Sequence, residues 1–385
     1  MIKIGLLSYC SSIYPYASRD IADGFYAALP ETIVRENFFH FVPDYVKQAT
    51  AKGVKEAVQK LLFFDAVDVI SGPVSYRSVP ELIPLIQKHE KLGFFFDLGE
   101  YIPYFNLVSD HVYFNSMLYW QSQYALGNWA YKEFGDKGAV VMSLYDSGYH
   151  LHSAFRQGAI GAGSKVIDYC VLHGDPNKSM VKGKIDEFFK NMERAFPSYI
   201  HAIFCGSEAT EFFEAFAASK LNGKVPLLIT AHMASEEILS SVTNLGLRAY
   251  AASLYNYHSQ DSLNIQFKSS FENNFGRKAG IFSLLGFEMG LLFKNLYPAL
   301  RKKDFASARQ LLKNERIQSP RGEISFDLNQ SFALPVIDIE QIDISNKRIC
   351  KMVVEQGKAL EYNNQVYEHI HRENVSGWQN PYLAV

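Results

Sequence analysis

The sequence lacks several features that mark metal-binding, disulfide-rich or nucleic-acid-binding proteins. Its four cysteines lie far apart along 385 residues and form no Cys-x-x-Cys pair, so their spacing predicts neither a zinc site nor a disulfide framework. The net charge of -2 and the pI of about 6.6 give no basic surface for nucleic acid or an anionic membrane. No apolar run reaches the roughly 18 residues that a membrane-spanning helix needs.

Sequence motifs for nucleotide binding and catalysis are also missing. There is no P-loop and no G-x-S-x-G elbow. The glycine-rich segment 158–163 follows a predicted helix and precedes a predicted strand, the reverse of a dinucleotide site, and this order predicts a turn that ends the helix. The pairs His150/His152 and His369/His371 have no third ligand at metal-site spacing. No cofactor is therefore expected.

Four acidic residues lie at predicted strand ends, where an acid–base pair for catalysis would be placed. No nucleophile with a recognisable base accompanies them, and each suits a structural role near a helix start. The sequence therefore favours a protein without enzymatic activity. These acidic residues are Asp97, Glu100, Asp146 and Glu208.

The sequence does contain a regular alternation of strands and helices. Strands are predicted at 2–7, 38–42, 67–71 and 92–96 with helices between them, which indicates a parallel sheet covered by helices on both faces. The same order restarts near residue 116 and continues to about 250. With 48% hydrophobic residues, the chain predicts an α/β protein of two Rossmann-like open parallel sheets.

The segment 67–87 carries the clearest local signal for a binding site. Its β-branched strand ends at Gly72-Pro73, and Ser78 with Glu81 predicts a capping box that starts a helix. A turn at a helix N-terminus offers free N–H groups and partial positive charge to a small anion such as a carboxylate. The alternative is an ordinary strand-to-helix connection. The turn carries Ser75, Tyr76 and Arg77.

Small polar and aromatic residues follow the strands of both halves. Because ligands bind outside the carboxyl ends of parallel strands, we expect these residues to face a cleft suited to a small, partly apolar ligand with one charged end. The candidates in the first half are Tyr14, Tyr16, Ser75, Tyr76, Arg77, Asp97 and Gly99, and those in the second half are Tyr145, Tyr149, Ser207, Glu208 and His232.

Several segments resemble, in order and spacing, the type I periplasmic solute-binding proteins of ABC importers, in the branched-chain amino acid and receptor ligand-binding branch. They are IKIGLLS at 2–8 with DGFYAAL at 23–29, the segment 67–87, VVMSLYDSGYHLHSAFRQG at 140–158 and SPRGEISFD at 319–327. The resemblance implies two lobes that are joined by a three-crossing hinge and close on a ligand. It implies an N-terminal lobe of 1–116 plus 254–328, a C-terminal lobe of 117–253 plus 329–345, and an extension at 346–385.

By position, the resemblance places the carboxylate-binding turn at Ser75–Arg77, a partner turn at Asp97–Gly99 and an aromatic lid at Tyr149. The family's serine cluster and alanine/threonine pair are replaced at these two turns, and its first-lobe cysteine pair is absent. The expected ligand is therefore either an amino acid or an aromatic or other small carboxylate.

The resemblance implies a non-enzymatic periplasmic protein that delivers its ligand to the membrane permease of an ABC importer. Met1 leads directly into the first predicted strand, without the charged and apolar segments of a signal peptide. This start allows two interpretations. One is a periplasmic protein whose leader is absent from the sequence, and the other is a cytosolic sensor of the same fold that regulates a protein partner.

Overall fold

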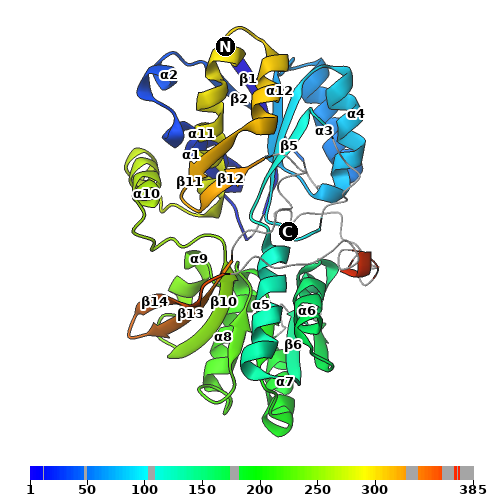
Figure 1. Cartoon of the computed structure of the whole chain (residues 1–385), viewed down its shortest axis with the longest axis vertical. Helices are drawn as coiled ribbons and strands as arrows, with labels where there is room; N and C mark the ends of the chain where they lie inside the picture. The colour runs from blue at the N-terminus through cyan, green and yellow to red at the C-terminus, as the bar shows by residue number, and fades with distance from the viewer. Residues whose placement is uncertain are drawn as a thin grey trace.

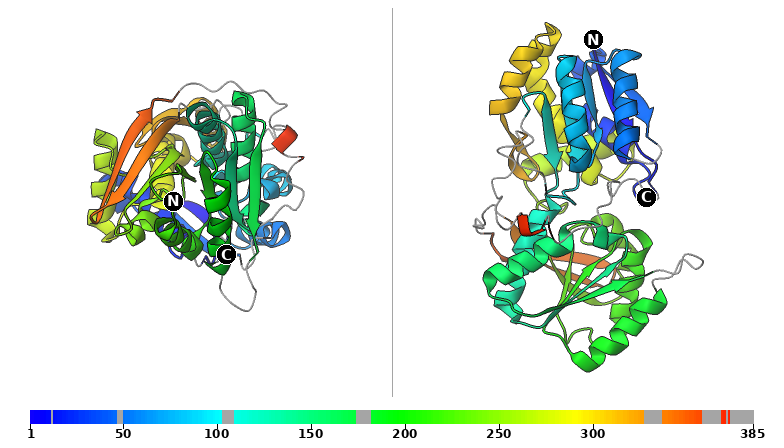
Figure 2. Two further views of the ribbon diagram at one scale, coloured as in Figure 1. Left: turned by 90° about the horizontal axis from the view of Figure 1, so that it is seen from below. Right: turned by 90° about the vertical axis from the view of Figure 1, so that its right-hand side faces the viewer.

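The computed structural model describes residues 1–11, 13–46, 50–102, 109–173, 182–326, 337–357, 368–370 and 372. Figures 1 and 2 show two lobes, one built on each of two sheets, with the chain passing between them. Across these residues, no helix combines the length and hydrophobicity needed to cross a bilayer.

The N-terminal lobe contains a fully parallel five-stranded sheet in the order β2-β1-β3-β4-β5. Along β4, Phe94 and Phe96 pack on the α1/α11 side, whereas Phe95 packs on the α3/α4 side. The strand is apolar throughout because both of its faces are buried. The strands are β1 (Ile2–Ser8), β2 (Phe39–Tyr45), β3 (Val69–Pro73), β4 (Leu92–Asp97) and β5 (Val112–Ser116). The helices are α1 (Ala17–Ala28), α2 (Glu31–Arg35), α3 (Ala51–Phe63), α4 (Val79–Lys88), α10 (Ser262–Phe275), α11 (Ile281–Arg301) and α12 (Phe305–Asn314).

The C-terminal lobe contains a seven-stranded sheet in the order β14-β13-β10-β9-β8-β6-β7. β13 runs antiparallel to both of its neighbours, β10 and the edge strand β14, and the other pairings are parallel. The strands are β6 (Gly138–Ser143), β7 (Ile167–Leu172), β8 (Ile200–Ile203), β9 (Leu227–Ile229), β10 (Leu247–Ser253), β13 (Asp338–Ser345) and β14 (Arg348–Glu355). The helices are α5 (Tyr119–Phe134), α6 (Leu151–Ala162), α7 (Lys182–Ala195), α8 (Gly206–Ala218) and α9 (Glu236–Leu239).

The expected fold class, two open and mostly parallel sheets in two lobes, is confirmed. The chain crosses between lobes after β5, after β10, and again between the hairpin β11 (Arg316–Ser319) and β12 (Gly322–Ser325) and strand β13. β14 lies in the range expected as a C-terminal extension, yet it pairs with β13 as the edge of the second sheet. The sequence also predicts a strand at 333–339, and the part of it before Ile337 lies outside the described residues.

Each lobe holds one helix pair in backbone contact through glycine. A Cβ atom built on Gly158 of α6 would lie 2.0 Å from the carbonyl oxygen of Tyr124 in α5, and one built on Gly127 would lie 1.9 Å from that of Phe155. Gly24 and Gly286 make the equivalent contacts between α1 and α11. Gly163, with a φ of +119°, ends α6 as predicted, but Gly158 serves helix packing.

A buried guanidinium connects three segments where the chain first leaves the N-terminal lobe. Arg321, in the β11–β12 turn, donates to both carboxylate oxygens of Glu288 in α11 at 2.7 and 2.9 Å. It also donates to Asn115 Oδ1 at 2.6 Å and to the Ser116 carbonyl at 2.7 Å, at the end of β5. The Glu288 side chain is fully buried and that of Arg321 is 5% exposed, so each charge depends on the other for its solvation.

We predict that Gly158→Ala destabilises the protein by about 1–3 kcal/mol, because the new methyl group forces α5 and α6 apart. Gly183→Ala is the matched control, since a Cβ atom there meets nothing within 4 Å; it is expected to be neutral or slightly stabilising. Urea unfolding of both variants measures the difference. Equal midpoints would show that the α5–α6 contact tolerates a side chain.

We predict that Arg321→Met lowers the free energy of unfolding by about 3–5 kcal/mol, because it leaves the buried Glu288 carboxylate without its cation. Arg316→Met removes a comparable ion pair to Glu323 whose side chains are 61% and 49% exposed, and should cost less than about 1 kcal/mol. Denaturant titration compares the two. A similar loss in both variants would contradict the role of Arg321.

Candidate functional site

The two lobes meet where the loop after β4 contacts the start of α6. The backbone N–H of His150 donates to the Glu100 carbonyl at 2.9 Å, and the N–H of Ile102 donates to His150 Nδ1 at 2.9 Å. The Tyr101 hydroxyl reaches the Gly148 carbonyl at 3.3 Å. Because His150 Nδ1 accepts a hydrogen bond, that nitrogen carries no proton. These bonds hold loop 97–102 of the first lobe against the second.

Loop 97–102 presents two buried carboxyl groups. Asp97 is 2% exposed and Glu100 is 1% exposed. Within the described residues, no hydrogen bond of ordinary geometry reaches either oxygen of Asp97 or Oε1 of Glu100, whereas Oε2 of Glu100 accepts from the Leu98 N–H at 3.2 Å. Burial, with the nearby Glu100 charge, raises the pKa of Asp97 well above its usual range, although hydrogen bonds from Ser116 and the Gly99 backbone oppose this shift. Burial raises the pKa of Glu100 to about 7.

Tyrosines from both lobes surround these acids. Tyr76 stacks on Phe114 with ring centroids 4.4 Å apart. The hydroxyls of Tyr76 and Tyr119 are buried, and neither makes a hydrogen bond of ordinary geometry to a described residue. Burial raises the pKa of Tyr76, and the charges of Asp97 and Glu100 raise it further. In the second lobe, Tyr149 is fully buried and its hydroxyl lies 2.6 Å from that of Tyr145. The site is thus aromatic on both sides.

His232 follows β9 and faces Tyr119, with ring centroids 5.9 Å apart. Its Nε2 lies 2.9 Å from the Phe204 carbonyl and 3.2 Å from Thr230 Oγ1. Since a carbonyl only accepts, Nε2 carries the proton. Burial lowers the pKa of His232 to about 4, so the ring is neutral near pH 7.

Two adjoining hollows lie beside this region, one of about 40 Å³ and one of about 220 Å³. Both are lined by residues from the two lobes, and they share Glu237, Gly280 and Ile281. The larger hollow is bordered by Tyr14 and Tyr16 from the loop after β1. Tyr14 packs edge-on against Phe282, with ring centroids 5.0 Å apart. The hollows therefore extend the site along the hinge.

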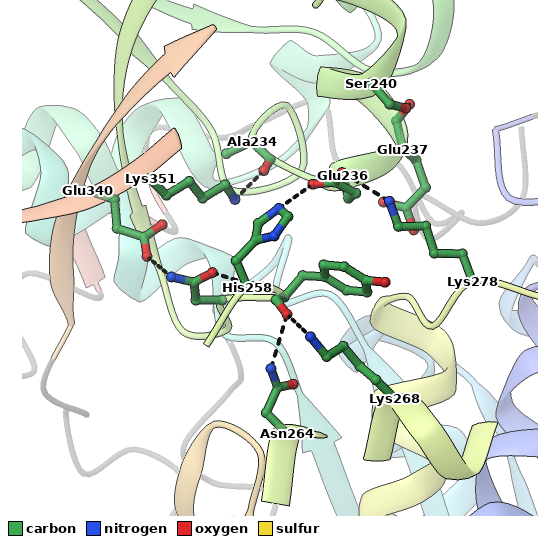
Figure 3. Close-up of polar contacts among 12 residues, drawn as sticks. Ala234, Glu236, Glu237, Ser240, His258, Asn264, Lys268, Lys278, Glu340 and Lys351 are labelled. Atoms are coloured by element: carbon green, nitrogen blue, oxygen red, sulfur yellow. Dashed lines mark hydrogen bonds and ion pairs between the residues drawn. The ribbon is translucent and has the colours of Figure 1, made fainter. Parts of the chain in front are cut away.

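An ion-pair cluster joins the lobes next to the smaller hollow (Figure 3). Glu236, which begins α9, accepts from Lys278 of the first lobe at 3.0 Å and lies 3.0 Å from His258 Nε2 in the second crossing. Burial acts to raise the pKa of Glu236, but hydrogen bonds from Lys278 and His258 lower it below its ordinary value. The cluster therefore favours the observed arrangement of the lobes.

Some of the residues predicted from the sequence lie where the lobes meet, and others lie away from that region. Tyr76, Asp97, Tyr145, Tyr149 and His232 are in or next to the region where the lobes meet, and Tyr14 borders the larger hollow. Glu208 is half-buried at the start of α8, where burial raises its pKa and Ser143 lowers it. Ser207 is exposed, and Tyr16 is 57% exposed. Gly99 contributes backbone only, with a φ of +75°.

The turn after β3 differs from the capping box expected there. Ser78 makes no side-chain cap; instead Ser75 Oγ accepts from the Arg77 N–H at 3.3 Å and caps a 3-10 turn, Tyr76–Ser78, ahead of α4. Ser75 is 2% exposed, so its hydroxyl serves the turn itself. The half-buried Arg77 guanidinium lies over the Tyr101 ring, 5.2 Å from its centroid.

The sequence reasoning did not select Tyr101, Tyr119, Glu237 or Lys278 as site residues, and considered Glu100 only as a possible catalytic acid. Tyr119 directly follows the first crossing, and this position in the chain could have identified it as a candidate site residue. Glu237 and Lys278 lie outside the expected strand ends, and only the packing of the lobes brings them to the site.

We predict that Glu100→Gln increases stability at pH 8 by about 1–3 kcal/mol, because it removes a buried charge. The folded-state pKa of about 7 exceeds the ordinary 4.5, so the stability that this group gives at low pH is lost as pH rises through about 7. Unfolding at pH 5 and 8 measures the change in slope. The exposed Glu81→Gln is the control, and an unaltered wild-type slope in Glu100→Gln would contradict the assignment.

Comparison with known proteins agrees with this architecture. A family model described as periplasmic binding protein matches residues 1–334. Curated protein sequences gave no match.

Similar solved structures include an ABC-transporter solute-binding protein from R. palustris in complex with benzoate, with 17% identity, coverage of 94% of this chain and 98% of that one, and a TM-score of 0.71. A substrate-binding protein from Sphaerobacter thermophilus has 15% identity, coverage of 93% and 98%, and a TM-score of 0.75. The branched-chain amino acid binder LivJ from Streptococcus pneumoniae, with isoleucine bound, has 14% identity, coverage of 92% and 99%, and a TM-score of 0.69. The chain belongs to the periplasmic binding protein family, with the type I fold of ABC-transporter solute-binding proteins.

Proposed function

We propose that this chain is an extracytoplasmic solute-binding protein of an ABC importer. It captures a small carboxylate-bearing ligand, an amino acid or an aromatic acid, between its lobes and passes it to a membrane permease. The observation that carries the proposal is a set of buried polar atoms near where the lobes meet that have no hydrogen bond of ordinary geometry to any described residue. They belong to Tyr76, Asp97, Glu100 and Tyr119. Buried polar groups normally have partners, and a bound solute would supply them.

Hinge closure supplies the mechanism. The lobes are joined by crossings after β5, β10 and β12, and a few residues in such connections absorb domain rotation. The contacts of His150 with loop 97–102 and of Lys278 with Glu236 form only when the lobes are close. A ligand that adds contacts to both lobes shifts the population toward this closed form. The permease would recognise the closed form.

The ligand class follows from the turn after β3 and from related structures. Arg77 brings a half-buried cation to the loop that contacts the second lobe, where it suits a carboxylate. Solved neighbours were crystallised with benzoate, 3,4-dihydroxybenzoic acid and isoleucine, all of which carry a carboxylate. The tyrosines of both lobes suit an apolar or aromatic body. Capture and delivery require neither catalysis nor a cofactor.

We predict that a panel of benzoate, 4-hydroxybenzoate, isoleucine and phenylalanine at millimolar concentration contains at least one compound that raises the melting temperature, because a ligand that binds only the folded state stabilises it. Arg77→Ala should weaken binding of that compound by about 1–3 kcal/mol through loss of a charge-assisted hydrogen bond. Arg35→Ala, at a side chain that is 76% exposed, is the control.

Two outcomes would count against the proposal. No thermal shift with any compound would remove the support for solute capture. Equal affinities in Arg77→Ala and Arg35→Ala would place the ligand's carboxylate elsewhere.

A further inference from the structure

β14 is a free edge of the second sheet. It is the outermost strand in the order β14-β13-β10-β9-β8-β6-β7 (Figure 1), and it runs for eight residues, Arg348–Glu355, without a proline. Its side chains Met352, Val353 and Val354 are 55%, 44% and 40% exposed. A long edge strand with exposed apolar side chains is a template for a further strand. This edge is therefore suited to pairing with another chain.

The hairpin that joins β13 to β14 determines which backbone groups of β14 face the free edge. Ser345 pairs with Arg348 across the two-residue turn 346–347, in which the φ values are +50° and +60°. The residues that flank such a turn exchange hydrogen bonds, and the direction of bonding then alternates along the strand. No backbone hydrogen bond from another described segment reaches the groups that point away from β13. These groups belong to Ile349, Lys351 and Val353.

The strand is complementary to a second copy of itself in an antiparallel arrangement. A two-fold axis at Lys351 places Ile349 opposite Val353 of the second copy, so that their edge N–H and C=O groups can pair. The same axis places Cys350 opposite Met352. The pairing of β14 with β13 shifts register only beyond Val353, so the strand is regular over this stretch. Each exposed apolar side chain of the stretch thus meets a counterpart.

The charges along β14 favour the same arrangement. The hairpin enters the strand through Lys347 and Arg348 and leaves it at Glu355, so antiparallel pairing brings the basic start of each copy near the acidic end of the other. Opposite charges across a strand pair are stabilising, and like charges are destabilising. The Lys351 ammonium, next to the axis, donates to the Ala234 carbonyl at 2.8 Å. This bond holds the charge against its own lobe.

We propose that the free edge of β14 is a homodimer interface, in which two copies of the chain pair β14 with β14, antiparallel about Lys351, and so join their second sheets. The self-complementary order of charges and apolar residues favours a second copy over an unrelated extended segment. A single strand pair is a small contact compared with the roughly 1,200–2,000 Å² that stable interfaces bury, so the dimer dissociates on dilution. The inference does not depend on the proposed solute capture.

Sedimentation velocity of the full chain over about a hundredfold range of concentration tests the association. We expect the mass to rise from the 43.7 kDa of the monomer toward twice that value. Val353→Pro removes an N–H group at the free edge and spares the bonds to β13, and Val353→Lys adds a charge there. Each should weaken the dimer tenfold or more. Val34→Lys, at a side chain that is 39% exposed in α2, is the matched control.

A cross-link tests the register of the pair. Cys350 lies opposite position 352 of the second copy in a non-hydrogen-bonded pair, where Cα atoms are about 4.5 Å apart, within the range of a disulfide. Cys10 is also exposed, so the test uses a Cys10→Ser background. In that background, Met352→Cys should form a disulfide-linked dimer on mild oxidation, whereas Arg348→Cys should not.

Three outcomes would overturn the proposal. One is a chain that stays monomeric at every concentration, which would leave the edge to an extended segment of another protein. Another is a dimer that both substitutions of Val353 leave unchanged, provided that circular dichroism shows the variants folded. If Val353→Pro does not fold, Val353→Lys and the cross-link decide. The last is a cross-link through Arg348→Cys as strong as that through Met352→Cys, which would contradict the register centred on Lys351.

Discussion

The Arg321–Glu288 pair fixes the region on which the candidate site depends. Through Asn115 and Ser116, Arg321 holds the end of β5 at the first crossing. From there the chain turns back onto the acidic loop, because the N–H groups of Met117, Tyr119 and Trp120 donate to the carbonyls of Asp97, Leu98 and Gly99 at 3.2, 3.0 and 2.9 Å. The hinge and the carboxyl groups are therefore parts of one hydrogen-bonded unit.

Gly99 allows this unit to form. Its φ is +75°, and a Cβ atom there would lie 2.5 Å from the Cα atom of Leu118. Only glycine combines that backbone conformation with such a close approach. The loop also contacts the second lobe through the Glu100 carbonyl and Ile102. Because loop 97–102 is bonded both to the first crossing and to the second lobe, a movement of the lobes also moves the carboxyl groups of Asp97 and Glu100.

The sequence predicted the architecture well because both sheets are formed by short apolar strands alternating with helices, and topology then places strand ends on a common edge. This reasoning selected Asp97, Tyr76 and Tyr149, which lie near where the lobes meet, and their role in binding stays a prediction. The capping box at Ser78 was wrong because Ser75 is better placed to cap the 3-10 turn. Tyr119, Glu237 and Lys278 belong to crossings and loops whose positions are set by lobe packing, for which local patterns carry no signal.

The buried carboxyl groups join stability to recognition. Burial removes the hydration of the Glu100 carboxylate, and the Leu98 N–H compensates only in part, so the free energy of unfolding falls as pH rises through about 7. The backbone carbonyl of the same residue accepts from the His150 N–H of the second lobe, so this charge forms at the contact between the lobes. Local stability is thus given up at the place where the proposed solute binds, as is common at functional sites.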